Sequence, residues 1–209
     1  MDNLNKEQQE AVMYFGGPLL VLAGAGSGKT KVLTHRVAYL IEKNLVNPEN
    51  CLLLTFTNKA AAEMKQRIGN DSIGFAGTFH GFCVRVLRVD GKAIGIDPNF
   101  LIYDENDQKD LIKDIIIELG IKETIKPASI LYAIGEAKNQ MLTPNSYAEI
   151  ASGDFGETVS RVYREYEKKL TEINALDFDD LLIKTVLLFE IPQIVLKWRE
   201  KIKQIFVDE

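Results

Sequence analysis

Cysteine, tryptophan and histidine are scarce in this chain of 209 residues, which contains two, one and two of them respectively. Cys51 and Cys83 cannot form a disulfide framework and match no metal-ligand spacing, which predicts two small apolar core residues in a reducing compartment. No apolar run reaches the roughly 18 residues that span a bilayer, and the polar N-terminal stretch MDNLNKEQQEAV does not resemble a secretion signal. We therefore expect a globular cytoplasmic protein without membrane contact.

Positive charge is also in deficit, since the net charge is −5, and this balance argues against a generally nucleic-acid-binding surface. The distribution is uneven, however. Residues 24–39 hold three basic side chains and no acid, residues 55–68 hold three against one, and residues 97–119 hold seven acids against two lysines. Positive charge therefore gathers in the N-terminal third of the chain, where most of the motifs lie.

Two kinds of hydrophobic pattern divide the chain. Up to about residue 88, short apolar runs such as LLVLA, CLLLTF and IGFAG alternate with helical patterns, which predicts strand–helix units around a parallel sheet. From residue 89 to 176 the pattern is helical, and the later run KQIFV predicts a return to the sheet. We expect an α/β core formed by residues 1–88 and 177–209, with residues 89–176 as an all-helical inserted subdomain.

The expected insertion contains three amphipathic patterns. The stretch DENDQKDLIKDIIIELG predicts a helix capped by Asp104 and stopped at Gly120, and a second helix is expected to begin at Pro127. The third pattern places six apolar or aromatic side chains at helical spacing, where they are expected to face a core: Val159, Val162, Tyr163, Tyr166, Leu170 and Ile173.

The most specific motif is LLVLAGAGSGKT, an apolar run followed by a glycine-rich turn and then by Lys29 and Thr30 at the start of an amphipathic helix. A phosphate-binding loop has this arrangement: a buried strand leads into the turn, N–H groups surround phosphates, the lysine reaches the β- and γ-phosphates and the hydroxyl holds Mg²⁺. The strict pattern has glycine where Ala23 stands. The alternative is a flexible turn before a surface helix, and a phosphate loop alone leaves kinase, GTPase, transporter ATPase and helicase open.

Two further stretches admit a structural and a binding interpretation. In TFTNK, between an apolar run and a helical pattern, Phe56 suits base stacking and Asn58 suits phosphate contact, but a core phenylalanine and a helix cap fit as well. In GTFHGF, His80 between aromatic residues is either a packed side chain or a ligand-binding one.

Carboxylates cluster at two places. Asp177, Asp179 and Asp180 in ALDFDDLL are either metal ligands or an N-cap with its partner at the third helical position, and the cap is the simpler interpretation. Asp208 and Glu209 come directly after the run KQIFV, which is expected to be a buried strand.

These motifs, in this order, resemble those of superfamily 1 DNA helicases of the UvrD/Rep/PcrA type. The resemblance covers essentially the whole chain: LNKEQQEAV is similar to the Q-motif, AGAGSGKT to the family's phosphate loop with its alanine, TFTNK and GTFHGF to single-stranded DNA motifs, and IFVDE to the start of Walker B. It implies a P-loop NTPase (RecA-like) parallel-sheet core that is incomplete in this chain.

The resemblance also implies a role for individual residues. Gln8 would contact the adenine edge and Arg36 would pack on the adenine; Lys29 and Glu209 would be catalytic, and Thr30 and Asp208 would hold Mg²⁺. The implied nucleotide site comprises Gln8, Ala23, Gly24, Ala25, Gly26, Ser27, Gly28, Lys29, Thr30, Lys31 and Arg36. The implied DNA-binding residues are Phe56, Thr57, Asn58, Lys59, Thr78, Phe79 and His80.

The function implied is that of an ATP-dependent DNA helicase or translocase, with ATP and Mg²⁺ as cofactors and single-stranded DNA and duplex junctions as partners, as in DNA repair. Because the Walker B motif is cut, we expect a fragment that lacks the second RecA-like domain and its arginines, binds nucleotide with little turnover, and self-associates through an unpaired sheet edge. Two alternatives stay open: a self-contained small P-loop NTPase or kinase, and a module that binds nucleotide or DNA without turnover.

Overall fold

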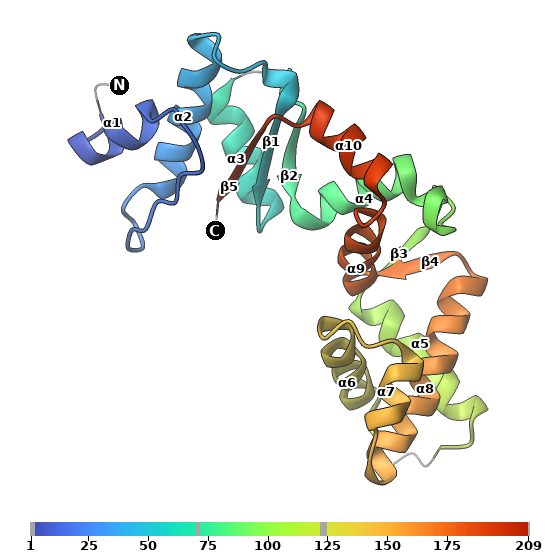
Figure 1. Ribbon diagram of the computed structural model, residues 1–209. Coiled ribbons are helices and arrows are strands. Elements are labelled where there is room, and N and C mark those ends of the chain that lie inside the picture. Colours follow the sequence, from blue (N-terminus) through green and yellow to red (C-terminus); the bar gives the residue numbers. More distant parts are fainter. Residues whose placement is uncertain (1–2, 70–71, 122–124, 209) are drawn as a thin grey trace. The chain divides into compact units, whose positions relative to one another are not determined.

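The computed structural model describes residues 3–69, 72–121 and 125–208. The chain divides into two compact units, unit 1 made of Met1–Phe82 and Pro192–Glu209 and unit 2 made of Cys83–Ile191 (Figure 1). Each unit has its own apolar core. None of the helices in the described ranges combines the length and the apolarity needed to cross a membrane.

A three-stranded parallel sheet forms the centre of unit 1 (Figure 1). Its order is β2 (Phe75–Thr78), β1 (Cys51–Thr55) and β5 (Gln204–Asp208). Thr55 pairs with Thr78 on one side and with Asp208 on the other, so the three strands end at one edge. The α/β class with a parallel sheet, as expected from the sequence, is therefore observed.

Helices pack on this sheet and on one another. Unit 1 contains α1 (Lys6–Met13), α2 (Lys29–Glu42), η1 (Pro48–Asn50), α3 (Asn58–Ile68), the beginning of α4 (Phe79–Asp90), and α10 (Pro192–Lys201). Buried side chains of α2, α3 and all three strands share one core, which comprises Val37, Leu40, Cys51, Leu53, Met64, Ala76 and Phe206. A smaller cluster of Leu4, Val12 and Val32 attaches α1 to α2.

The run LLVLA, expected to be a buried strand, is not in the sheet. Leu20 and Leu22 are 80% and 85% exposed, and a cavity of about 960 Å³ is lined by this segment on one side and by β5 on the other. A strand of a parallel sheet needs a hydrogen-bonded neighbour, and no strand is assigned between this segment and β5 among the described residues. The strand prediction is therefore wrong here, because the apolar run has no adjacent strand to pair with.

The expected strand KQIFV does return to the sheet as β5, but it is buried on one face only. Phe206 reaches the core, whereas Ile205 and Val207 are 61% and 50% exposed. Since the pairing of β5 within the described residues is with β1, it is an edge strand rather than the fully buried strand that the sequence predicted.

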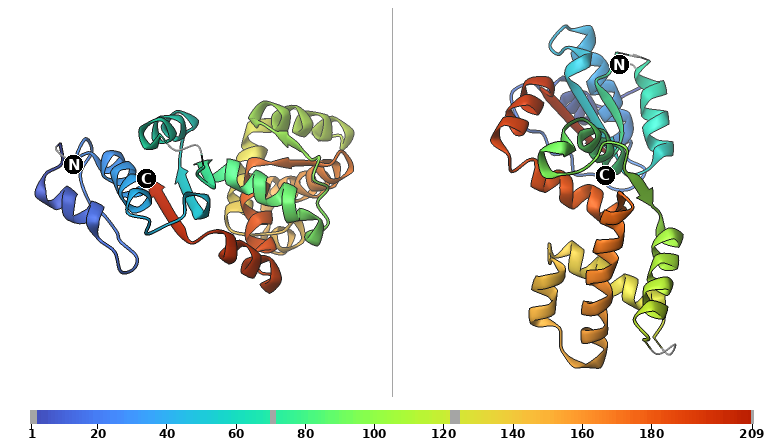
Figure 2. Two further views of the ribbon diagram at one scale, coloured as in Figure 1. Left: turned by 90° about the horizontal axis from the view of Figure 1, so that it is seen from above. Right: turned by 90° about the vertical axis from the view of Figure 1, so that its right-hand side faces the viewer.

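Unit 2 is mostly helical. It contains the remainder of α4, η2 (Gly91–Ile94), β3 (Leu101–Tyr103), α5 (Glu105–Glu118), α6 (Pro127–Asn139), α7 (Pro144–Ile150), α8 (Gly153–Glu172), β4 (Ala175–Asp177) and α9 (Phe178–Leu188). Helices α5, α6 and α8 pack against one another (Figure 2). The core that they enclose includes Ile112, Ile115, Ile130, Val159 and Tyr166.

The three predicted helices of this region are confirmed. Asp104 caps α5 with a capping box, Gly120 follows the helix at φ +62°, and α6 begins at Pro127. Five of the six side chains predicted to face the core from α8 are buried. The exception, Ile173, is the C-cap and lies beyond the last helical turn.

The expectation of an all-helical segment is wrong, because β3 pairs in parallel with β4, with Leu101 opposite Ala175. Strands of three residues are too short to produce an alternating pattern, and their pairing depends on a partner more than 70 positions away. Unit 2 also includes more of the sequence than residues 89–176: it extends from Cys83 to Ile191, and its helix α9 packs on η2. That residues 89–176 form an insertion in a core domain stays a prediction.

Candidate functional site

The glycine-rich turn of unit 1 ends at the N-terminus of a helix. Gly28 is the N-cap of α2 at φ +85°, and Gly26 also has a positive φ of +74°, a conformation that glycine adopts without steric cost. Ala23, where the strict motif has glycine, is not among the residues with positive φ, so a methyl group is tolerated there. The N–H groups of the first helical turn and the positive end of the helix dipole suit an anion.

Lys29 and Thr30 face different partners at the start of α2. The Lys29 ammonium donates to the carbonyls of Ala23 and Gly24, at 3.1 and 3.2 Å. The Thr30 hydroxyl donates to Oδ2 of Asp208 at 2.8 Å. The two residues predicted to hold a metal ion are thus in direct contact although 178 positions separate them in the sequence.

The contact between Thr30 and Asp208 is set by the sheet. Asp208 is the last residue of β5, opposite the last residue of the central strand, and is only 7% exposed. A hydroxyl has one hydrogen and two lone pairs, so Thr30 is able to donate to the carboxylate and still present an oxygen to a cation. A hydroxyl and a carboxylate oxygen are ligands that suit Mg²⁺. Glu209, the predicted catalytic carboxylate, lies outside the described residues.

Helix α1 carries the residue expected at the adenine edge. The Gln8 amide oxygen accepts from the Asn5 N–H at 3.0 Å within a capping box, and its Nε2 donates to the carbonyl of Ser27 in the glycine-rich turn, also at 3.0 Å. The structure therefore places Gln8 against the loop. Contact with adenine stays a prediction.

Arg36, expected to pack on the adenine, is bound to the backbone of α1. Its guanidinium donates to the carbonyls of Ala11, Val12 and Tyr14 and lies over the Tyr14 ring, 5.9 Å from the centroid. Burial lowers the pKa of Arg36 despite the opposing effect of Tyr14. The contact of Arg36 with Tyr14 was not predicted from the sequence.

The predicted DNA-binding residues lie at the same edge of the sheet as Asp208. Phe56 follows β1 and is 80% exposed, so its interpretation as a core residue is wrong. The cap of α3 is Thr57, whose hydroxyl accepts from the Ala60 N–H at 3.1 Å, rather than Asn58. Asn58 and Lys59 are exposed in the first turn of that helix.

The second predicted DNA motif follows β2. The Thr78 hydroxyl accepts from the Gly81 N–H at 3.1 Å, which fixes this side chain at the start of α4. Phe79 is exposed and His80 is partly buried. Strand ends at one edge of a parallel sheet are where α/β proteins commonly bind ligands.

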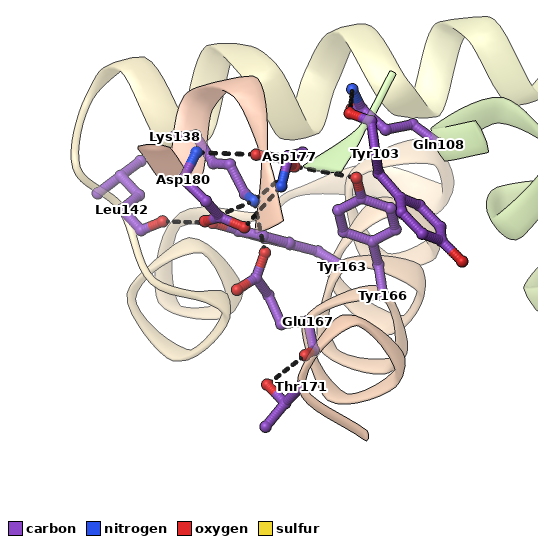
Figure 3. Close-up of polar contacts among 10 residues, drawn as sticks. All are labelled: Tyr103, Gln108, Lys138, Leu142, Tyr163, Tyr166, Glu167, Thr171, Asp177 and Asp180. Carbon is purple, nitrogen blue, oxygen red and sulfur yellow. Dashed lines mark hydrogen bonds and ion pairs between the residues drawn. The ribbon is translucent and has the colours of Figure 1, made fainter. Parts of the chain in front are cut away.

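The acidic cluster of unit 2 has a structural explanation. Asp177 caps α9 in a capping box with Asp180, which confirms the interpretation as a helix cap. The ammonium of Lys138 lies among three carboxylates, 2.7 Å from Asp177, 2.7 Å from Glu167 and 3.0 Å from Asp180 (Figure 3). The charge that a metal ion would supply is thus supplied by the lysine.

Within this network Lys138, Asp177 and Asp180 are almost fully buried, and Glu167 is partly buried. Tyr166 donates to Oδ2 of Asp177 at 2.9 Å, next to the lysine (Figure 3). Burial raises the pKa of Asp180 to about 7, and Lys138 opposes that shift. Burial lowers the pKa of Lys138, but the charges of Asp180, Asp177 and Glu167 outweigh it and raise the pKa overall.

Lys138 was not predicted from the sequence, although a signal was present. In α6 it lies four positions after Ile134 and eight after Ile130, both buried, so it continues an apolar stripe. A lysine at such a position is almost never fully buried unless it is paired. The stripe therefore predicted acidic partners nearby without indicating which ones.

Comparison with known proteins identifies the family. Residues 4–209 match the UvrD/REP helicase N-terminal domain, and the chain belongs to that family. Among curated proteins, it is 46% identical to the ATP-dependent DNA helicase PcrA of Bacillus subtilis (strain 168), over 217 aligned residues that cover all of this chain and 29% of the relative. The PcrA proteins of Staphylococcus epidermidis (strain ATCC 35984 / DSM 28319 / BCRC 17069 / CCUG 31568 / BM 3577 / RP62A) and Staphylococcus aureus (strain Mu50 / ATCC 700699) are 45% and 44% identical, with 29% and 30% of their lengths covered. The chain thus spans under a third of these relatives.

Proposed function

We propose that this chain is the nucleotide- and strand-binding N-terminal part of an ATP-dependent DNA helicase, with an incomplete RecA-like core in unit 1. The observation that carries the proposal is the 2.8 Å contact between Thr30 and Asp208. It joins the residue after the loop lysine to a buried carboxylate at the end of a parallel strand, which is the pairing that holds Mg²⁺ in P-loop NTPases. Family membership supports ATP as the nucleotide.

The residues of the loop have distinct tasks in this proposal. The N–H groups that follow Gly24 and the N-terminus of α2 bind the phosphates. The Lys29 ammonium exchanges the carbonyls of Ala23 and Gly24 for phosphate oxygens. Thr30 and Asp208 hold the cation, which when bound neutralises charge on the phosphates. Glu209 orients the attacking water.

Single-stranded DNA is proposed to cross the edge where β1 and β2 end. The exposed ring of Phe56 is available for stacking on a base, a contact worth about 1–3 kcal/mol per base. Thr57, Asn58, Lys59, Thr78, Phe79 and His80 complete the proposed contacts. Helices α3 and α4 both begin at this edge, so the N–H groups of their first turns suit the phosphates of single-stranded DNA.

Turnover is proposed to require groups that the described site does not contain. In the family that the chain resembles, arginines of a second RecA-like domain contact the γ-phosphate, and such an arginine contributes roughly 10³- to 10⁵-fold to the rate. We therefore propose that these residues bind Mg-ATP and single-stranded DNA with little hydrolysis, and that unwinding belongs to a longer protein. A self-contained kinase is disfavoured, because the family match extends through residues 89–209.

The proposal is tested by nucleotide binding and hydrolysis in parallel, each with and without a single-stranded oligonucleotide. We expect saturable Mg-ATP binding that Lys29→Ala weakens strongly, with little phosphate release. An affinity that Lys29→Ala does not change would refute the nucleotide site. Rapid oligonucleotide-stimulated turnover that Lys29→Ala abolishes would show that the chain supplies the missing groups itself.

A further inference from the structure

Helix α1 is fastened to α2 at both of its ends. Near the start of α1, the Lys31 ammonium donates to the carbonyl of Asn3 at 2.5 Å. At the C-terminal end, Arg36 donates to the carbonyls of Ala11 and Val12 at 3.0 and 3.3 Å. The buried Val12 adds an apolar contact between the helices. The position of Gln8, between these two attachments, is therefore determined by α2.

The orientation of the Gln8 amide is determined as well. Its oxygen accepts from the Asn5 N–H, while Gln8 N–H donates to the Asn5 side chain at 2.8 Å. The amide nitrogen then faces the carbonyl of Ser27 at 3.0 Å. A reversed amide would lose both of its hydrogen bonds, since its nitrogen would face the Asn5 N–H and its oxygen would face the Ser27 carbonyl.

The Ser27 peptide is part of the turn that shapes the phosphate loop. The Ser27 N–H donates to the carbonyl of Gly24 at 3.3 Å. The Ser27 carbonyl belongs to the peptide bond with Gly28, which has a φ of +85°. A Cβ placed on Gly28 would lie 3.4 Å from Nε2 of Gln8, so the amide packs directly against the turn. Rotation of the Ser27–Gly28 peptide would break the bond to Gln8 and redirect the N–H groups that follow.

We propose that Gln8 is a positioning residue for the phosphate loop, acting through the Ser27 carbonyl to keep the loop N–H groups aimed at phosphate before any nucleotide arrives. This inference rests on the proposed nucleotide-binding function. It differs from a contact with adenine in one measurable respect. The effect of Gln8 extends to ligands without a base, including inorganic tripolyphosphate.

The test measures the affinities of the whole chain for Mg-ATP and for Mg-tripolyphosphate by calorimetry. Gln8→Glu removes the donor but keeps an oxygen for the Asn5 N–H, so α1 stays capped. Gln8→Met removes the donor without adding a charge. We expect both variants to weaken both ligands, by about 3- to 10-fold for the loss of one hydrogen bond, and the Met variant to weaken ATP and tripolyphosphate by the same factor.

Gln9 offers a matched control on the same helix. Its Nε2 donates to the carbonyl of Leu4 at 2.9 Å rather than to the loop. Gln9→Glu and Gln9→Met should leave both affinities unchanged, and an equal loss there would mean that α1 acts only through its general stability. If the Gln8 variants weaken ATP but not tripolyphosphate, the inference is wrong and the contact is with the base. If the unaltered chain binds neither ligand, the proposed function itself fails.

Discussion

Asp180 is a buried carboxyl group whose protonation at intermediate pH is altered by the fold. Burial raises its pKa to about 7 from an ordinary value of 3.8, against the opposing charge of Lys138. The folded chain therefore retains a proton that the unfolded chain releases at intermediate pH. The contribution of this group to the free energy of unfolding is fully present below pH 3.8 and is lost as the pH rises to about 7.

We predict that Asp180→Asn reduces the pH dependence of unfolding of unit 2, because the amide is neutral at every pH. In the unaltered chain the free energy of unfolding falls by up to about 1.4 kcal/mol for each unit that the pH rises within that window, because the folded state holds one more proton than the unfolded state. Urea unfolding followed at several pH values between 4 and 8 measures the slope. Asp110→Asn, an exposed carboxylate paired with Lys113, is the control. Parallel curves for Asp180→Asn and the unaltered chain would contradict the prediction.

At the scale of elements, the placement of β5 depends on Asn50. The Asn50 side chain donates to the carbonyl of Lys201 at 2.7 Å, and its own carbonyl accepts from the Lys203 N–H at 2.9 Å. These bonds fix the chain immediately before β5, and the strand then pairs in register with β1 as far as Asp208. Asn50 thus helps to place a carboxylate at the opposite end of the sheet.

We predict that Asn50→Ala lowers the affinity for Mg-nucleotide by about 3- to 10-fold, as expected for one lost hydrogen bond. Affinity without Mg²⁺ should change less, because the loop itself is untouched. Calorimetry with and without the cation measures both values. Asn47→Ala is the matched control, because it removes the N-cap of η1, in which the Asn47 side chain accepts from the Glu49 N–H. Equal losses with and without Mg²⁺ would show that β5 is placed by other contacts.

The second prediction for β5 concerns its free edge. Ile205 and Val207 are exposed on β5, which pairs with β1 alone among the described residues, and such an edge favours association between sheets. We predict concentration-dependent self-association of this chain and its reduction by Ile205→Lys, both measured by sedimentation velocity. Ile150→Lys replaces another exposed isoleucine, in α7, and should have no such effect. A chain that is monomeric at all concentrations would contradict this prediction.

The elements that the sequence predicted well are those with local signals. The cap at Asp104, the stop at Gly120 and the capping box of Asp177 are each encoded within a few residues. The run at 19–23 was wrongly predicted to be a strand, and β3 lies in a segment that was wrongly predicted to be all helical, because strand pairing depends on a partner that is distant in the sequence. The family resemblance implied Thr30 and Asp208 as metal ligands. The bond between Gln8 and Ser27 joins residues 19 positions apart and was found only in the structure.

At the scale of the whole molecule, the two units have separate cores, which predicts that damage to one spares the chemistry of the other. Lys138→Met leaves three carboxylates, two of them buried, without their cation and should destabilise unit 2 by about 3–5 kcal/mol. Affinity for Mg-ATP, which we assign to unit 1, should be unchanged under conditions where the variant stays folded. Lys113→Met removes an exposed ion pair and should cost about 1 kcal/mol or less.

Two measurements decide this prediction. Urea unfolding of the Lys138→Met variant is followed by the fluorescence of the single tryptophan, Trp198 of unit 1, and by tyrosine fluorescence, which reports mainly on unit 2 because five of the seven tyrosines lie there. Calorimetry with Mg-ATP reports on the nucleotide site. A loss of nucleotide affinity in a variant that is still folded would mean that the two units are energetically coupled.

The division of unit 1 along the chain has a consequence for synthesis on the ribosome. Unit 2 is one continuous stretch, whereas Thr30 meets Asp208 only after 178 further positions have been made. At about 5–20 residues per second, that interval lasts roughly ten to forty seconds. Unit 2 is complete at Ile191, 17 positions before Asp208, so it is able to begin folding while the sheet of unit 1 still lacks β5. The proposed nucleotide site therefore takes shape only after the whole of unit 2 has been made, and the apolar segments of unit 1 are open to chaperones until then.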